Sequence, residues 1–300
     1  MRRIRWPLAL GVVLVVAWVL NVSRPGRQAE GCPAGCATAG PRQTGPLRVM
    51  SLNVLHGFPR FAQLPERMEL IAAEIRRRDP DIVCLQEVPW HLGSTARTLA
   101  RRTGLNYLYL RANGNRWALL FEEGEVILSR FPLREVAAVE LEPQAGFFEH
   151  RVALVATAVT PWGKVRVFVS HLTAGDPAIN RGQAASLAAV VAGDPIRPAL
   201  VAGDFNAREE TPQIQALDWI DTYRAVHPRD EGPTCCVKDL TAGPGEALEK
   251  RIDYVFLIPG AEGVAVVSSR RAFNEPFRRG NGWLWASDHA GLVTEIDLAP

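Results

Sequence analysis

The chain has 300 residues, 47% of them hydrophobic, with 34 basic and 32 acidic side chains and a formal net charge of +2. This length is sufficient for one large domain or two small ones with a sizeable core, and the hydrophobic content excludes wholesale disorder. The balanced charge gives no global electrostatic signature of a nucleic-acid binder, although a local basic groove is compatible with it. Composition therefore does not indicate which class of molecule the protein binds.

The N-terminus combines a basic flank with an apolar run. Three of the first five residues are arginine, and the run from Trp6 to Val22 is about the minimum length for crossing a bilayer. Residues 1–22 are predicted to be an export signal or a membrane anchor, and the lack of a prompt small-x-small cleavage pattern favours the anchor. The basic flank favours a catalytic part outside the cytoplasm, so the protein is expected to be membrane-anchored there, or secreted or periplasmic.

Two further regions follow this segment. Residues 23–46 are rich in Gly, Pro, Ala and Arg, a composition typical of a flexible tether. Residues 47–300 contain neither an internal repeat nor a second linker. They are predicted to form a single domain.

The five cysteines are consistent with an oxidising compartment. Cys32 and Cys36 could close a small loop, whereas the adjacent Cys235 and Cys236 have a spacing that is awkward for an ordinary mutual bridge. Cys84 lies in an apolar run and is predicted to be a core thiol. The sequence leaves the pairing open.

Short apolar strands alternate with a few helices along the domain, as judged from hydrophobic periodicity and turn residues. The predicted helices cover residues 65–78, 95–102, 179–192 and 213–220. The predicted strands cover residues 47–55, 81–87, 106–111, 117–121, 125–129, 136–141, 151–159, 164–171, 199–203, 251–257, 264–268 and 292–296. Residues 230–250, with Gly and Pro throughout, are expected to be a long functional or mobile loop.

The strand that begins at Ala199 and ends at Gly203 delivers two polar side chains. Asp204 and Asn206 are two residues apart, so they point the same way if strand geometry persists. A carboxylate beside a carboxamide suits proton handling or the binding of an oxyanion. The alternative is a turn with hydrogen-bonding side chains.

The same pattern of a polar residue at the end of an apolar segment recurs along the chain. Each residue alone fits a capped turn, a paired carboxylate or a core histidine with a hydrogen-bond partner. Together, the carboxylates and amides are hard oxygen ligands that suit Mg or Mn better than zinc, and the histidines titrate near neutrality. Such a set suits phosphate-ester hydrolysis. Its members are Asn53, Glu87, His171, Asp204, Asn206, Asp253, Asp288 and His289.

Seven short segments in a fixed order carry a family resemblance. They are Ser51–Val54, Leu85–Val88, Leu128–Pro132, Ser170–Leu172, Gly203–Asn206, Arg251–Tyr254 and Ser287–His289. From Leu47 to Leu298 the sequence resembles the endonuclease/exonuclease/phosphatase superfamily, also called deoxyribonuclease-I-like. The resemblance implies an α/β (α+β) fold: a four-layer αββα sandwich of two mixed, mostly antiparallel sheets with the site at one rim.

The resemblance also implies ligands for a divalent metal, Mg or Mn. Glu87 looks like the principal metal ligand, with Asn53 and Asp288 close to the metal or the phosphate. His171 and Asn206 look like the residues that hold the phosphoryl oxygens.

The resemblance also implies a second group of residues, which take part in proton transfer. His289 looks like the general base that activates water, oriented by Asp253. Asp204 looks like the carboxylate that orients or activates the nucleophile or assists the leaving group, and its share of the work relative to His289 stays open. The chain departs from the family pattern after His289, where Ala290 and Gly291 replace the usual residue and proline.

The sequence therefore predicts an exported or membrane-anchored phosphodiester hydrolase, most similar to an endonuclease or exonuclease. Hydrolysis of a phospholipid or of a sphingomyelin-type headgroup is the alternative substrate class. A non-catalytic binding module on the same fold is the alternative outside enzymology. The sequence gives no indication of oligomeric state.

Overall fold

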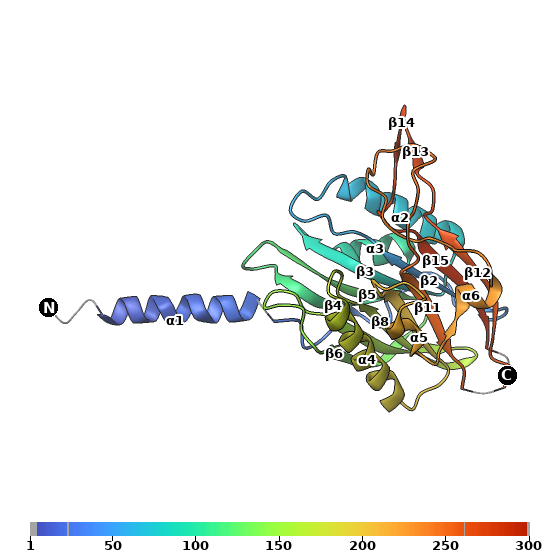
Figure 1. Cartoon of the computed structure of the whole chain (residues 1–300), viewed down its shortest axis with the longest axis horizontal. Helices are drawn as coiled ribbons and strands as arrows, with labels where there is room; N and C mark the ends of the chain where they lie inside the picture. The colour runs from blue at the N-terminus through green and yellow to red at the C-terminus, as the bar shows by residue number, and fades with distance from the viewer. Residues whose placement is uncertain (1–4, 23, 261, 299–300) are drawn as a thin grey trace.

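The computed structural model describes residues 5–22, 24–260 and 262–298, and its core is a pair of β-sheets packed face to face (Figure 1). In spatial order the seven-stranded sheet comprises β1 (Glu30–Cys32), β4 (Asn106–Asn115), β5 (Phe121–Ser129), β3 (Ile82–His91), β2 (Leu47–Asn53), β15 (Gly291–Asp297) and β12 (Ala265–Ala272). The six-stranded sheet comprises β10 (Ile220–Asp221), β11 (Asp253–Ile258), β9 (Ala199–Asp204), β8 (Gly163–His171), β7 (Val152–Thr160) and β6 (Leu133–Glu140). Strands β13 (Phe277–Arg279) and β14 (Gly282–Leu284) form a separate hairpin.

Helices cover the outer faces of both sheets. One apolar cluster joins α2 (Leu64–Arg78) and α3 (Thr95–Thr103) to the seven-stranded sheet, and another joins α4 (Pro177–Gly193) and α5 (Pro212–Gln215) to the six-stranded sheet. Helix α6 (Thr222–Val226) follows β10, and α1 (Arg5–Val22) precedes the domain. The predicted four-layer αββα sandwich is confirmed.

Alternation along the strands explains these layers. In β2, Leu47 and Val49 belong to the apolar cluster between the sheets, whereas Met50 and Leu52 belong to the cluster under α2 and α3. Successive strand residues point to opposite faces, so a strand that is apolar on both faces is buried on both. Every residue of β2 except Arg48 is buried.

Two parallel strand pairs fix the position of the site. Strand β2 pairs parallel with β3, and β8 pairs parallel with β9, so the polar residues that follow these strands gather at one rim. Gly203 permits the close approach of β9 to β8, because a Cβ there would lie 1.8 Å from the Ser170 carbonyl oxygen. The chain therefore stays in strand β9 through Gly203 as far as Asp204.

Three of the differences between the predicted elements and the structure have a clear cause. The predicted strand 117–121 is a turn between β4 and β5, because the Asn115 side chain accepts hydrogen bonds from the amides of Trp117 and Ala118 and closes the chain on itself. Strand β3 continues past Glu87 to His91 because it pairs with the start of β5. The predicted helix 213–220 ends after one turn, as α5, and the chain then forms strand β10.

The segment expected to be a flexible tether is hydrogen-bonded to the domain. Strand β1 pairs antiparallel with β4, and the Asn106 side chain accepts hydrogen bonds from the amides of Cys36 and Ala37. Cys32 and Cys36 form a disulfide, and Arg42 binds the buried carboxylate of Asp81. Composition predicted flexibility here, but these long-range contacts order most of the segment.

Helix α1 forms over the apolar run at the N-terminus and projects from the domain (Figure 1). Among the described residues, no helix combines the length and apolarity needed to cross a membrane. The structure therefore gives no support to the predicted transmembrane helix.

Candidate active site

The side chain of Asn53 joins the two sheets at the rim. Its Nδ2 donates to Glu87 Oε1 at 3.0 Å and to Asp204 Oδ2 at 3.1 Å, and its Oδ1 accepts from the Leu55 amide at 3.0 Å. Asn53 ends β2, Glu87 lies in β3 of the same sheet, and Asp204 ends β9 of the other sheet. Three residues predicted as site members thus lie in one hydrogen-bonded group.

Glu87 is a partly buried carboxylate held in its ionised form. It occupies a break in the pairing of β3 with β5 and has a φ of 55°. Burial opposes its charge, but His56 and the hydrogen bond from Asn53 lower its pKa below the ordinary value. The His56 backbone amide donates to Glu87 Oε2 at 3.2 Å. An ionised carboxylate at this position suits a cation.

Asp288 supplies a second carboxylate beside Glu87. Burial raises its pKa, His289 opposes this rise, and the negative charge of Glu87 adds to it. The Ser287 hydroxyl donates to the Asn53 carbonyl oxygen at 2.7 Å and so ties this loop to the end of β2. Two partly buried, mutually repelling carboxylates and a carboxamide are the hard oxygen donors that fit Mg or Mn.

His171 is buried at the end of β8 and is held neutral. Arg151 Nη1 lies 3.1 Å from His171 Nδ1. Arginine only donates, so Nδ1 accepts. Burial, and then the charge of Arg151, lower the pKa of His171 well below its ordinary value, so the ring carries its proton on Nε2. That proton faces Asp204 Oδ2 at 3.5 Å, whereas Asn206 Nδ2, 3.0 Å from Nε2, donates to the Leu172 carbonyl oxygen at 3.0 Å.

Asp204 and Asn206 meet through a turn rather than through continued strand geometry. Asp204 Oδ1 accepts from the Asn206 amide at 2.8 Å, and Asn206 has a φ of 48°. Burial and the neighbouring Asp253 raise the pKa of Asp204 to about 7, whereas His289 opposes the rise. The segment is therefore a turn, and its two polar side chains also lie among the other candidate site residues.

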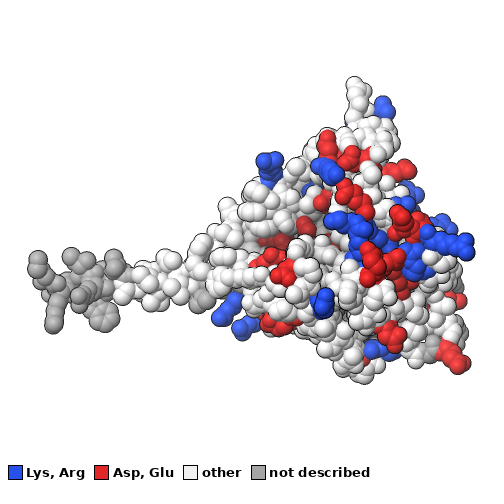
Figure 2. Space-filling view, in the orientation of Figure 1, with Lys and Arg blue, Asp and Glu red and all other residues white. Residues whose placement is uncertain are grey.

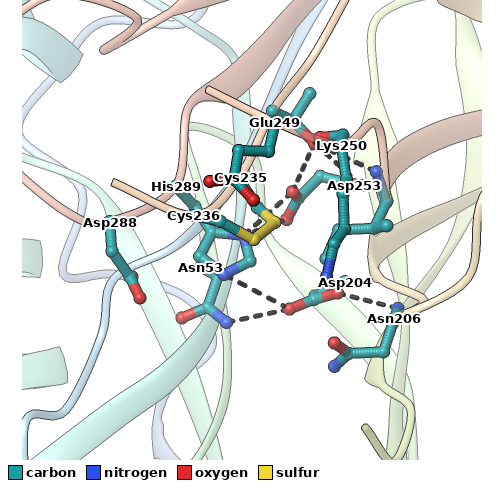
Figure 3. Close-up of a disulfide and its surroundings, with 12 residues drawn as sticks. Asn53, Asp204, Asn206, Cys235, Cys236, Glu249, Lys250, Asp253, Asp288 and His289 are labelled. Carbon is teal, nitrogen blue, oxygen red and sulfur yellow. Dashed lines mark hydrogen bonds and ion pairs between the residues drawn. A yellow bond between two sulfur atoms is a disulfide. The ribbon is translucent and has the colours of Figure 1, made fainter. Parts of the chain in front are cut away.

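His289 is oriented by Asp253, as the resemblance implied. Its Nδ1 lies 2.9 Å from Asp253 Oδ2, and its Nε2 lies 3.7 Å from Asp204 Oδ2 (Figure 3). Burial opposes a charge on this ring, but Asp253 and Asp204 raise its pKa well above the ordinary value. One ligand atom from each of these three residues lies within 4.8 Å of the others, so the group could also hold a metal ion.

The eight predicted residues therefore lie at one rim, and four others that sequence reasoning missed support them. His56 and Arg151 contact Glu87 and His171, and Thr234 donates to Asp253 Oδ2 at 2.7 Å. Arg67 is fully buried and donates to backbone carbonyls on both sides of the site, at Val54, Leu55 and Ala286. Arg67 could have been found from the sequence, because it lies on the apolar face of its helix. No sequence pattern marks Thr234.

Residues 50–289 match the sequence profile of the Endonuclease/Exonuclease/phosphatase family. The chain belongs to this family. Members of the family generally hydrolyse phosphodiester bonds and depend on a divalent metal. The conclusion rests on most of the chain, since the matched range includes all eight predicted residues.

Solved structures of this family share the fold. An endonuclease/exonuclease/phosphatase from Beutenbergia cavernae DSM 12333 is 24% identical, with a TM-score of 0.64 over 85% of this chain and 72% of that one. A humanised D. rerio TDP2 is 19% identical, with a TM-score of 0.67 over 85% and 100%. D. rerio TDP2 in complex with a single-strand DNA product is 18% identical, with a TM-score of 0.67 over 84% and 98%. A comparison with curated proteins gave no match.

Proposed function

We propose that this family member is a Mg- or Mn-dependent phosphodiester hydrolase, similar to an endonuclease or exonuclease, in which an activated water attacks phosphorus in line. The observation that carries the proposal is the Asn53 carboxamide, which donates to both Glu87 and Asp204. It brings a carboxylate suited to a metal within reach of a carboxylate suited to proton transfer. A module that only binds a partner needs neither a metal ligand nor a proton-transfer group.

Glu87, Asn53 and Asp288 would hold the divalent ion. When bound, the ion supplies Lewis-acid stabilisation of the charge that develops on phosphoryl oxygens. We prefer this set to Asp204, Asp253 and His289, because Asp253 is already committed to hydrogen bonds from Thr234 and His289. The negative charges of Asp288 and Glu87 repel each other, so each would gain from a shared cation.

Asp204 is the better candidate for the general base. The resemblance gave that role to His289, but its neighbouring carboxylates favour the imidazolium form, which has no free lone pair to accept a proton. Asp204, with a pKa of about 7, is matched to proton acceptance near neutral pH. His289, oriented through Nδ1, then places its charged Nε2–H where it stabilises negative charge on the phosphoryl group.

His171 and Asn206 bind phosphoryl oxygens on the other side of Asp204. The Arg151 contact leaves Nε2–H of His171 as its donor. Asn206 Nδ2 lies 3.0 Å from that nitrogen and is oriented by its hydrogen bond to the Leu172 carbonyl oxygen. Both groups are oriented before substrate arrives, which reduces the reorganisation needed in the transition state.

A nucleic acid is the first substrate class that we propose. Its support is the family itself and the DNA product bound to the D. rerio protein of the same fold. Aromatic side chains flank Glu87: the rings of His56 and Phe121 are 5.3 Å apart, and Phe58 stacks on Phe121 at 4.4 Å. Phe58 is half exposed and presents a face on which a base can stack.

A lipid headgroup is the second class, favoured by exposed apolar side chains near the site. Phe147 and Phe148, 53% and 59% exposed, lie four and three residues before Arg151. Trp117 is 87% exposed in the turn between β4 and β5. In Figure 2, charged side chains are most crowded on the side away from α1. Exposed apolar side chains of this kind suit contact with a lipid interface.

Export or membrane anchoring belongs to the same proposal. Its support is the disulfides Cys32–Cys36 and Cys235–Cys236, which persist in oxidising compartments, together with the basic flank and apolar helix at the N-terminus. Cell fractionation of the expressing organism measures the compartment directly. Recovery of the mature chain only from the cytoplasm would contradict this part of the proposal.

A substrate panel on the full chain tests the activity. It comprises single- and double-stranded DNA, RNA, phospholipid and sphingomyelin vesicles and a phosphomonoester, each with Mg²⁺, with Mn²⁺ and with a chelator. We expect turnover of at least one phosphodiester that the chelator abolishes. The absence of turnover throughout would overturn the enzyme proposal and favour the binding module.

A further inference from the structure

The segment Thr234–Val237, here called the clamp segment, lies between the loop that carries His289 and the residues that lead into β11, which begins at Asp253. On one side the amides of Cys236 and Val237 donate to the Asp288 carbonyl oxygen at 2.9 and 3.1 Å. On the other side the amides of Thr234 and Cys235 donate to the Lys250 carbonyl oxygen at 2.6 and 3.0 Å. The clamp segment therefore ties the loop of Asp288 and His289 to the start of β11.

The Thr234 hydroxyl reaches the charge pair itself. It is fully buried, donates to Asp253 Oδ2 at 2.7 Å and accepts from the amides of Ile252 and Asp253 at 3.1 and 3.2 Å. The Lys250 carbonyl oxygen, at 3.4 Å, is the poorer acceptor for its single proton. Asp253 Oδ2 in turn bonds His289 Nδ1. The orientation of His289 therefore depends on Thr234 through one intermediate carboxylate.

A covalent bond between neighbours fixes the middle of the clamp segment. Cys235 and Cys236 form a disulfide, which closes a small ring through the peptide bond that joins them (Figure 3). Cys236 has a φ of 91°, a region that residues with a Cβ seldom occupy. Ring closure restricts the torsions available to Cys236, and the amide of that residue is one of the donors to Asp288. Opening the ring would release this donor.

The two cysteines of this disulfide differ in exposure. Cys235 is fully buried, whereas Cys236 is partly exposed. A dithiol reductant would attack the sulfur of Cys236, and its second thiol would complete the exchange. The products are two cysteine thiols and the oxidised reductant, with two electrons and two protons transferred.

We infer that Thr234 is a positioning residue for the Asp253–His289 pair, and that the Cys235–Cys236 disulfide is a reducible lock that keeps the clamp segment in place. The inference rests on the proposed function for its kinetic consequence. With the disulfide closed, His289 is held for catalysis. With the disulfide reduced, the clamp segment loosens and hydrolysis slows.

Substitution of Thr234 tests the positioning role. Thr234→Val keeps the shape but removes the hydroxyl, so we expect kcat to fall about 10–100-fold with KM nearly unchanged. Thr234→Ser restores the hydroxyl and should bring kcat back to within about threefold of wild type, a rescue that a packing role alone would not give. Equal kcat in Thr234→Val and wild type would overturn this role.

Reduction tests the lock, and the second disulfide supplies the control. We expect a dithiol to lower kcat reversibly in wild type and in the Cys32→Ser/Cys36→Ser variant. In Cys235→Ser/Cys236→Ser, kcat should already be low and insensitive to the dithiol. Alkylation and mass spectrometry identify the bond that opens. An unchanged kcat with the Cys235–Cys236 bond fully reduced, or a loss that follows Cys32–Cys36, would overturn the inference.

A readout without substrate separates this inference from the proposed function. The imidazole N–H proton of His289 that is shared with Asp253 can be followed by NMR. Thr234→Val and reduction should each shift or broaden that resonance, whether or not any phosphodiester is hydrolysed. An unchanged resonance in both cases would overturn the inference, whereas a changed resonance without turnover on the substrate panel would overturn only the proposed function.

Discussion

At the scale of single residues, the site is a set of buried charges whose neighbours decide their protonation. Glu87 is held ionised and His171 neutral, while Asp204 lies between Asp253, which repels its charge, and His289, which stabilises it. Function at this scale therefore comes from position and not from residue type.

Asp204→Asn tests the proposed base. We expect kcat to fall about 10²–10⁴-fold, because the amide cannot accept the proton of water. In wild type kcat/KM should rise with pH through about 7, since only the ionised form of Asp204 acts as a base. Stopped assays from pH 5 to pH 9 measure both effects. Glu210→Gln, which changes an exposed carboxylate, is the control and should behave as wild type.

Glu125 gives a prediction about stability. It is buried with one oxygen lacking a hydrogen-bond partner, and burial, then Glu123, raise its pKa well above the ordinary value of 4.5. Between the ordinary and the raised pKa the unfolded chain ionises and the folded chain does not, so the wild type loses stability as pH rises. Glu125→Gln removes this loss and should raise the free energy of unfolding at pH 8 by about 1–3 kcal/mol.

The same variant should show no gain at pH 4, where both states of the wild type hold the proton. Urea unfolding at the two pH values, in the presence of a chelator, measures the difference. A constant gain at both values would show that Glu125 does not titrate between them. The exposed Glu210→Gln variant should unfold like the wild type at each pH.

At the scale of elements, the close contact of β8 with β9 is the feature that places His171 beside Asp204. Gly203→Ala would drive a methyl group into the Ser170 carbonyl oxygen, 1.8 Å from the position of the new Cβ. We expect a loss of about 3 kcal/mol or more in the free energy of unfolding, because neither backbone can retreat without breaking the ladder.

A second glycine serves as the matched control for this prediction. Gly193 ends α4, and a Cβ there would meet nothing within 4 Å. Gly193→Ala should be neutral or stabilise by about 0.4–1 kcal/mol through the entropy of the unfolded chain. Similar losses in the two variants, measured by denaturant unfolding, would show that the contact at Ser170 is not the cause.

At the scale of the whole molecule, the site couples the two sheets. Asn53 and Glu87 come from one sheet, and Asp204 and His171 from the other, so the αββα sandwich must form before the cluster exists. Metal binding should therefore stabilise the folded state alone. At a free Mg²⁺ concentration of 100 times Kd, the gain is about 2.7 kcal/mol.

Glu87→Ala tests this coupling. In thermal unfolding monitored with and without Mg²⁺, we expect wild type and Glu210→Gln to gain Tm on addition of the ion. Glu87→Ala should lose most of that gain as well as its hydrolytic activity. An equal Mg²⁺-dependent gain in Glu87→Ala would exclude Glu87 as a principal ligand.

The local pattern of the sequence determined most of the elements and which residues could do chemistry. Apolar runs predicted the buried strands, and polar residues in or beside those runs predicted the eight candidate residues that the structure brings together at one rim. Short-range signals suffice here because a buried strand needs an apolar run, and the residues that follow it meet water or ligand at the rim.

Only the tertiary structure decided the parts that depend on distant segments. Residues 24–46 look flexible by composition, yet they are ordered by pairing with β4 and by contacts with Asp81 and Asn106. The Cys235–Cys236 bond and the Thr234 hydroxyl have no sequence periodicity that marks them. Their proposed roles follow from their contacts with Asp253 and Asp288. Hydrogen bonds between segments this far apart in the sequence are set by tertiary packing.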